Sequence, residues 1–143
     1  MADIYTASAT STGDGRAGGE VVSSDGQLDL TLAVPTEMGG PGGGTNPEQL
    51  FAAGWSACFH SAIKGVARAQ QITLTDSAVV ADISLLPLDG GRPGYTIGAT
   101  LHVELAGLDQ QAAEELVRAA HQVCPYSNAT RGNIDVQLVV ETS

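Results

Sequence analysis

Hydrophobic and polar residues alternate along the first third of the chain, as they do in β-strands. The alternation predicts strands over residues 4–10, 19–24 and 28–32, with Asp25-Gly26 as a tight hairpin turn between the last two. Residues 35–45 have the glycine-rich composition of a flexible loop. This part of the chain is therefore expected to form a small sheet that is followed by a loop.

A long helix is expected after this loop. Asn46 suits the N-cap, Pro47 suits the first helical position, and Gln49 stands where a reciprocal capping side chain is found. Small and apolar residues then recur with helical spacing. The predicted buried stripe consists of Phe51, Gly54 or Trp55, Cys58, Ala62, and Gly65 or Val66.

Strand-type alternation returns in the second half of the chain. Residues 79–86 and 95–105, joined by the turn-rich LDGGRPG, predict an antiparallel pair, and a last strand is expected over 134–140. Between them, Asp109 is expected to cap a helix that ends at Pro125. The predicted buried face of that helix consists of Ala113, Leu116, Val117, Ala120, and Val123 or Cys124.

The order of elements is β-β-β-α-β-β-α-β, without the regular alternation that is typical of a parallel sheet. It predicts an α+β fold of antiparallel sheets with a long central helix and a second helix. The length of 143 residues and a hydrophobic content of 43% suit a single domain over residues 1–143.

Charge and composition restrict the partners. A formal net charge of −10 makes nucleic acid and anionic membrane surfaces poor partners. The first residues resemble no secretory leader, and no apolar run approaches the roughly 18 residues of a membrane span. A cytoplasmic location is therefore expected, and two cysteines in a reducing compartment are not expected to form a permanent disulfide.

The two cysteines are the main candidates for chemistry. Cys58 lies on the predicted stripe of the long helix, where an inert core thiol is the simplest interpretation. Cys124 stands just before Pro125, where the chain is expected to leave the helix toward the surface. If the two thiols converge, they suit a cycle in which one attacks a peroxide and the other condenses with the resulting sulfenic acid.

Such a cycle needs a cation that favours the thiolate. The chain has only six Lys and Arg residues, and Lys64, Arg68 and Arg118 fit solvated helix faces. Arg16, in the loop GDGRAGG, has a side chain that is free to reach inward, and Glu48 at the helix start can clamp it, although most loop arginines are ordinary surface residues.

Two motifs carry a resemblance to a known family. The stretches GTNPEQLFAAGWSACF and HQVCPYSNATRGN, with an arginine in a glycine-rich N-terminal loop, resemble the organic hydroperoxide resistance (Ohr) branch of the OsmC-like proteins. The resemblance covers nearly the whole chain. It implies a lipoyl-dependent peroxidase in which Cys58 is the peroxidatic cysteine, Cys124 the resolving cysteine, and Arg16 with Glu48 the activating pair.

The same resemblance implies an intertwined homodimer and the absence of a bound cofactor. The substrates would be alkyl and fatty-acid hydroperoxides, and the reductant an external dithiol such as dihydrolipoamide on lipoylated proteins. Glu48 and Cys58, ten residues apart, would be separated by about 15 Å along one helix. Arg16 and Glu48 are therefore expected to act on the partner's Cys58, unless the helix breaks near Gly54.

Other interpretations are kept beside this one. Phe51 and Trp55 are candidates for the apolar approach to the thiol, although aromatic residues at helical spacing are more often plain core. No metal site is expected, because Cys58 and His60 point about 200° apart on a helix. The alternatives to an Ohr enzyme are an OsmC-type peroxidase of broader specificity and a non-catalytic module that senses redox state or binds an apolar ligand.

Overall fold

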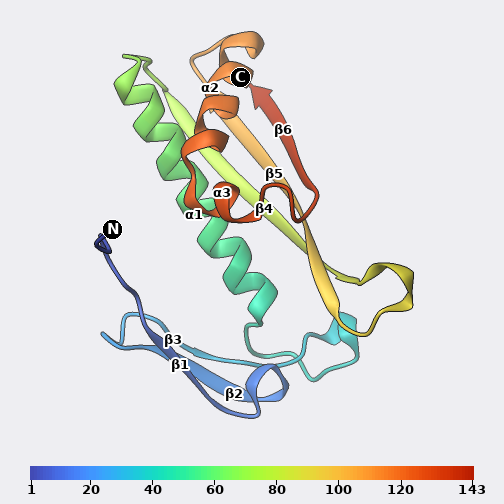
Figure 1. Cartoon of the computed structure of the whole chain (residues 1–143). Coiled ribbons are helices and arrows are strands. Elements are labelled where there is room, and N and C mark those ends of the chain that lie inside the picture. The colour runs from blue at the N-terminus through green and yellow to red at the C-terminus, as the bar shows by residue number, and fades with distance from the viewer. The chain divides into compact units, whose positions relative to one another are not determined.

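The computed structural model describes all 143 residues, which form two compact units, Met1–Leu50 and Phe51–Ser143. The first unit contains an antiparallel sheet of three strands in the order β1-β2-β3 (Figure 1). The strands are β1 (Ala9–Gly13), β2 (Gly19–Ser23) and β3 (Asp29–Thr31). The expectation of a single domain over 1–143 stays a prediction.

The hairpin between β2 and β3 forms at the predicted turn. Gly26 adopts a positive φ of 75°, and the Asp25 carboxylate accepts hydrogen bonds from the Ser23 hydroxyl and the Gln27 amide. The turn also limits β1, since Ala9 is already paired with Ser23 and β2 extends no further. The prediction of a strand over residues 4–10 is therefore wrong for residues 4–8, which have no neighbouring strand to pair with.

The second unit contains a sheet in the order β4-β5-β6. The long strands β4 (Asp76–Pro87) and β5 (Tyr95–Ala106) pair antiparallel over their whole length, as predicted. Strand β6 (Val136–Thr142) pairs parallel with β5, so the expectation of purely antiparallel sheets is wrong here. The reason is the helical crossover between β5 and β6, which returns the chain to the end of the sheet where β5 began.

Three helices are present, one more than predicted: α1 (Pro47–Ala69), α2 (Gln110–Val123) and α3 (Pro125–Thr130). Pro125 does not return the chain to a loop after α2; it opens α3, because its fixed φ fits the first helical position. Helix α1 runs without interruption through Gly54, so the alternative of a break there is wrong. Single-turn 3₁₀ helices lie at Gly15–Ala17, Thr36–Met38 and Asp89–Gly91.

The predicted N-caps of the two long helices are confirmed. The Asn46 side chain accepts a hydrogen bond from the Gln49 amide at 2.8 Å, and the Asp109 side chain accepts one from the Ala112 amide at 2.8 Å. The prediction that the Gln49 side chain takes part in a reciprocal cap of α1 is not met. The Gln49 side chain accepts instead from the Thr45 hydroxyl, also at 2.8 Å.

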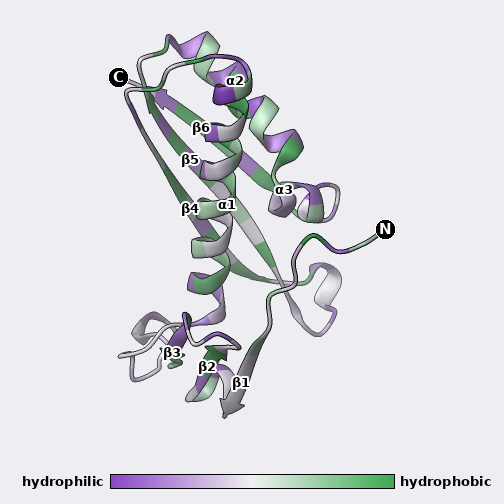
Figure 2. Ribbon diagram, turned by 90° about the vertical axis from the view of Figure 1, so that its left-hand side faces the viewer, coloured by the Kyte–Doolittle hydropathy of each residue, from purple (hydrophilic) through white to green (hydrophobic).

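The core of the second unit lies between the sheet and one side each of α1 and α2, and Figure 2 shows hydrophobic and hydrophilic positions interleaved along both helices. The predicted buried face of α2 is confirmed. The predicted stripe of α1 is displaced by about one residue, because the bulkier Phe59 and Ile63 fill the space against β5 and leave Cys58 at the margin. The fully buried residues of α1 are Trp55, Phe59, Ile63 and Ala67. No helix in the chain is both long and apolar enough to cross a membrane.

This displacement leads to a prediction about stability. Ile63→Ala removes a side chain with no exposed surface and should lower the free energy of unfolding by about 2–5 kcal/mol. Val66→Ala, at the half-buried margin of the same helix, should cost clearly less. Urea denaturation of both variants measures this, and equal losses would mean that the buried side of α1 is the one expected from the sequence.

Candidate functional site

Cys58 lies in the middle of α1, at the margin of the core. Its side chain is half-buried, and the neighbouring Phe59 on the same helix points fully into the core. The displaced stripe explains this position, since a rotation of one residue, about 100°, moves a helical side chain from the centre of a buried face to its edge. Cys58 therefore lies at the border of the apolar interior and is not fully enclosed by it.

Cys124 lies between α2 and α3, where its extended backbone serves as the last cap of one helix and the first cap of the next. Its side chain has no exposed surface. The expectation that the chain leaves toward the surface here is wrong, because Pro125 continues into α3 and the turn packs into the core. Both cysteines are free thiols.

The two thiols are neighbours, although they are 66 residues apart in the sequence. The Cys124 side chain lies close enough to the Cys58 thiol to affect its ionisation. Burial and then the charge of Cys124 raise the pKa of Cys58, because ionisation of one thiol opposes ionisation of the other.

Tyr126, which the sequence did not single out, has the opposite effect on the pKa of Cys58. The backbone N–H of Tyr126 lies close enough to the Cys58 sulfur to lower the pKa of the thiol. Pro125 has no N–H, so the N–H of Tyr126 is the first one available after Cys124. The sequence Cys-Pro-Tyr was the only signal that could have pointed to it.

Three aromatic rings form a cluster one to two helical turns before Cys58. Phe51 packs edge-on against both Trp55 and Tyr126, with ring centroids 5.8 and 5.7 Å apart, and Trp55 stacks on Tyr126 at 6.3 Å. Phe51 is half-buried, whereas Trp55 has no exposed surface. The role of these two residues in substrate binding stays a prediction, and in this conformation only Phe51 offers a surface.

Arg16 and Glu48 form a two-pronged ion pair within the first unit. The guanidinium donates to both carboxylate oxygens, at 2.9 and 2.6 Å. Arg16 lies in the 3₁₀ turn between β1 and β2, and Glu48 lies in the first turn of α1. The hydrogen bond raises the pKa of Arg16 and lowers the pKa of Glu48, so each charge stabilises the other. The expected contact is present, and its role in catalysis stays a prediction.

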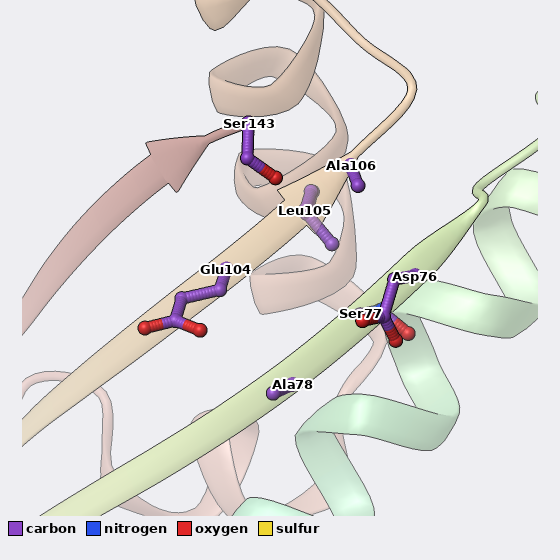
Figure 3. A pocket seen from close by; sticks show the side chains of 7 residues that line it. All are labelled: Asp76, Ser77, Ala78, Glu104, Leu105, Ala106 and Ser143. Atoms are coloured by element: carbon purple, nitrogen blue, oxygen red, sulfur yellow. The ribbon is translucent and has the colours of Figure 1, made fainter.

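Other polar groups lie apart from the two thiols. His60 is within 2.8 Å of the Ser77 hydroxyl, and His102 pairs with Asp82 on the sheet. A pocket of about 60 Å³ lies where β4 starts and β5 ends (Figure 3). The two carboxylates of this pocket, Asp76 and Glu104, come from neighbouring strands. In Figure 3 the Glu104 side chain points away from the Asp76 side chain. Neither cysteine lines this pocket.

The chain has an α+β fold in which a free thiol on the long helix lies beside a second free thiol, so it is a dithiol protein. Comparison with known proteins shows to which family it belongs. The model of the OsmC-like protein family matches residues 40–139. An organic hydroperoxide resistance protein of Xanthomonas axonopodis pv. citri is 49% identical over 139 residues, which cover 96% of this chain and 94% of the relative.

Solved structures agree with this match. The chain superposes with a TM-score of 0.91 on an organic hydroperoxide resistance protein from Legionella pneumophila, which is 49% identical; 98% of this chain and 99% of the other are covered. For the organic hydroperoxide resistance protein OhrB of Bacillus subtilis the TM-score is 0.86 and the identity 46%, with 97% and 100% covered. The chain belongs to the OsmC-like family and, within it, to the organic hydroperoxide resistance proteins.

The ion pair predicts a pH-dependent stability. Glu48→Gln should lower the free energy of unfolding near neutral pH by about 1 kcal/mol or less, since solvent screens the partly exposed Arg16. The pKa of Glu48 is lowered in the folded chain, so its contribution is present above the ordinary carboxyl pKa and is lost as the pH falls through the folded value. Urea denaturation across the acidic range should show the two proteins converging in acid.

Glu115→Gln, at an exposed position on α2, serves as a control. Its free energy of unfolding should not show this pH-dependent difference from the unsubstituted chain. A difference between the Glu48→Gln variant and the unsubstituted chain that persists well below the ordinary carboxyl range would contradict the assignment of the effect to the ion pair.

The two neighbouring thiols predict a second pH effect. Cys124→Ala removes the charge that opposes ionisation of Cys58, so the pKa of Cys58 should fall and its alkylation should become faster at neutral pH. The pH dependence of iodoacetamide alkylation, followed by mass spectrometry, measures this. A shift to higher pH would mean that the Cys124 S–H stabilises the thiolate as a donor.

Proposed function

We propose that this protein is a thiol peroxidase that reduces organic hydroperoxides to alcohols. The observation that carries the proposal is the adjacency of the Cys58 and Cys124 thiols on different elements of the second unit. It is supported by relatives of nearly equal length that are named organic hydroperoxide resistance proteins. Such a name fits involvement in the response to oxidative stress.

In the first step the Cys58 thiolate attacks the outer oxygen of the hydroperoxide. The O–O bond breaks, the alkoxide leaves and takes up a proton as the alcohol, and Cys58 becomes a sulfenic acid. Cys124 then attacks the Cys58 sulfur, releases water and leaves a Cys58–Cys124 disulfide. One hydroperoxide and two thiols thus give one alcohol, one water and one disulfide.

The first step needs an ionised Cys58, yet the surroundings of Cys58 within its own unit raise the pKa of the thiol. A cation from outside that unit would lower the pKa of Cys58 again. Arg16 is the proposed source, with Glu48 as the residue that orients the guanidinium; the cation would also stabilise negative charge that develops on the leaving oxygen.

The uninterrupted helix bears on which Cys58 this pair serves. Glu48 and Cys58 are ten residues apart on α1, which corresponds to about 15 Å of rise. Because no break at Gly54 shortens that rise, we favour a homodimer in which Arg16 and Glu48 act on the partner's Cys58. Phe51 and Trp55 would supply apolar surroundings for the alkyl group of the substrate.

An external dithiol would complete the cycle, and dihydrolipoamide on lipoylated proteins is the proposed donor in the cytoplasm. Such a reductant attacks one sulfur of the disulfide and expels the other as a thiolate. In this conformation Cys124 has no exposed surface and Cys58 is half-buried, so the attack is expected at the Cys58 sulfur. No bound cofactor is required for these steps.

Turnover of the two cysteine variants tests the proposal. Cys58→Ser should reduce the steady-state consumption of an alkyl hydroperoxide with dihydrolipoamide by at least about a thousandfold, because the nucleophile is lost. Cys124→Ser should consume about one hydroperoxide per chain and then stop, since no second thiol protects the sulfenic acid. Retention of most of the rate by Cys58→Ser would refute the proposal.

Two comparisons in the same assay separate the alternatives. Equal rates with hydrogen peroxide and an alkyl hydroperoxide would favour an OsmC-type peroxidase of broad specificity. Disulfide formation without sustained turnover, when dihydrolipoamide and glutathione are each supplied in excess, would favour a redox-sensing module.

A further inference from the structure

Gly54 is a glycine in the interior of a long helix, where it weakens the helix by about 1 kcal/mol relative to alanine. Its surroundings give a reason for the glycine. A Cβ at this position would overlap the hydroxyl of Tyr126 and lie 3.0 Å from the Cζ atom of the same ring. Gly65, three helical turns further along α1, differs: a Cβ there would meet nothing within 4 Å.

The Tyr126 ring therefore rests directly on the backbone of α1 at Gly54. Phe51 holds it edge-on, with interplanar angle 87°, and Trp55 lies nearly parallel to it, at 28°. Both partners belong to the same stretch of α1 as Gly54, so the ring has three neighbours on one helix. Contacts of this kind fix the orientation of an aromatic side chain.

The backbone of the same tyrosine faces the thiol. Cys58 follows Gly54 by four residues, so the two positions lie one above the other on one face of α1, about 6 Å apart along the axis. The ring of Tyr126 occupies the earlier turn, and its backbone N–H lies near the sulfur of Cys58 on the next turn, where it favours the thiolate. Cys124 precedes Tyr126 by two residues, so the docked ring also anchors the turn that presents the second thiol.

We propose that Tyr126 is a positioning residue for Cys58, and that Gly54 is required because it admits the tyrosine ring to the place from which the backbone N–H reaches the sulfur. The inference rests on the proposed function insofar as Cys58 is the attacking thiol. Tyr126 touches no reacting atom with its side chain; the ring acts through the α2–α3 turn, by holding one donor and one thiol against α1.

The test measures the reactivity of Cys58 without peroxide, so failure of the proposed function would not obscure it. Iodoacetamide alkylation of Cys58 in the reduced chain is followed against pH by mass spectrometry for Gly54→Ala and, as the matched control, Gly65→Ala. The added methyl group should displace the Tyr126 ring and weaken the N–H contact. Alkylation near pH 7 should fall about tenfold, as for a rise of one pKa unit, whereas the control should keep the unsubstituted profile.

Rescue separates positioning from general damage to the helix. The Tyr126 hydroxyl is the atom that the new methyl group overlaps, so adding Tyr126→Phe to Gly54→Ala should restore most of the alkylation rate. If Gly54→Ala does not fold, as judged by circular dichroism, Tyr126→Ala provides the second measurement, with the same loss expected. An unchanged profile in the variant that folds, an equal loss in Gly65→Ala, or the absence of rescue would overturn the proposal.

Discussion

The arrangement of the two thiols in the second unit depends on the packing of the α2–α3 turn against the middle of α1, because that contact brings the thiols together. Cys58 lies at the edge of the buried side of α1, and Cys124 lies in the turn itself. The core on both sides fixes the contact: fully buried residues of α1 and α2 meet alternate residues of β5. Without this packing, each cysteine would be an ordinary small apolar residue.

Packing that brings the sulfurs together also makes the thiolate unfavourable. Burial and a second ionisable thiol both oppose a negative charge on Cys58, and the backbone N–H of Tyr126 offsets only part of this. The chain separately contains a cation that is held in a fixed orientation, since Arg16 donates two hydrogen bonds to the Glu48 carboxylate. The proposed mechanism combines these features: it uses the fixed charge to ionise a thiol that its own surroundings keep neutral.

Local sequence signals predicted most of the elements correctly. Caps at Asn46 and Asp109, the Asp25-Gly26 turn and the alternation along β4 and β5 act through neighbouring residues, so they could be read directly. Three features could not be predicted from local signals: the parallel pairing of β6, the start of β1 and the rotation of the buried side of α1. Each of these depends on which distant partner is available, and the pattern within a segment does not contain that information.

The sequence by itself determined the chemical inventory: two thiols, few cations, and an arginine and a glutamate in segments that permit their pairing. It also determined the family, through the residues around both cysteines. Only the tertiary structure decided that Cys124 is buried, that the backbone N–H of Tyr126 lies near Cys58, and that Gly54 makes room for the tyrosine ring. The physical reason is that burial and close approach are properties of pairs of segments, which folding brings together from opposite ends of the second unit.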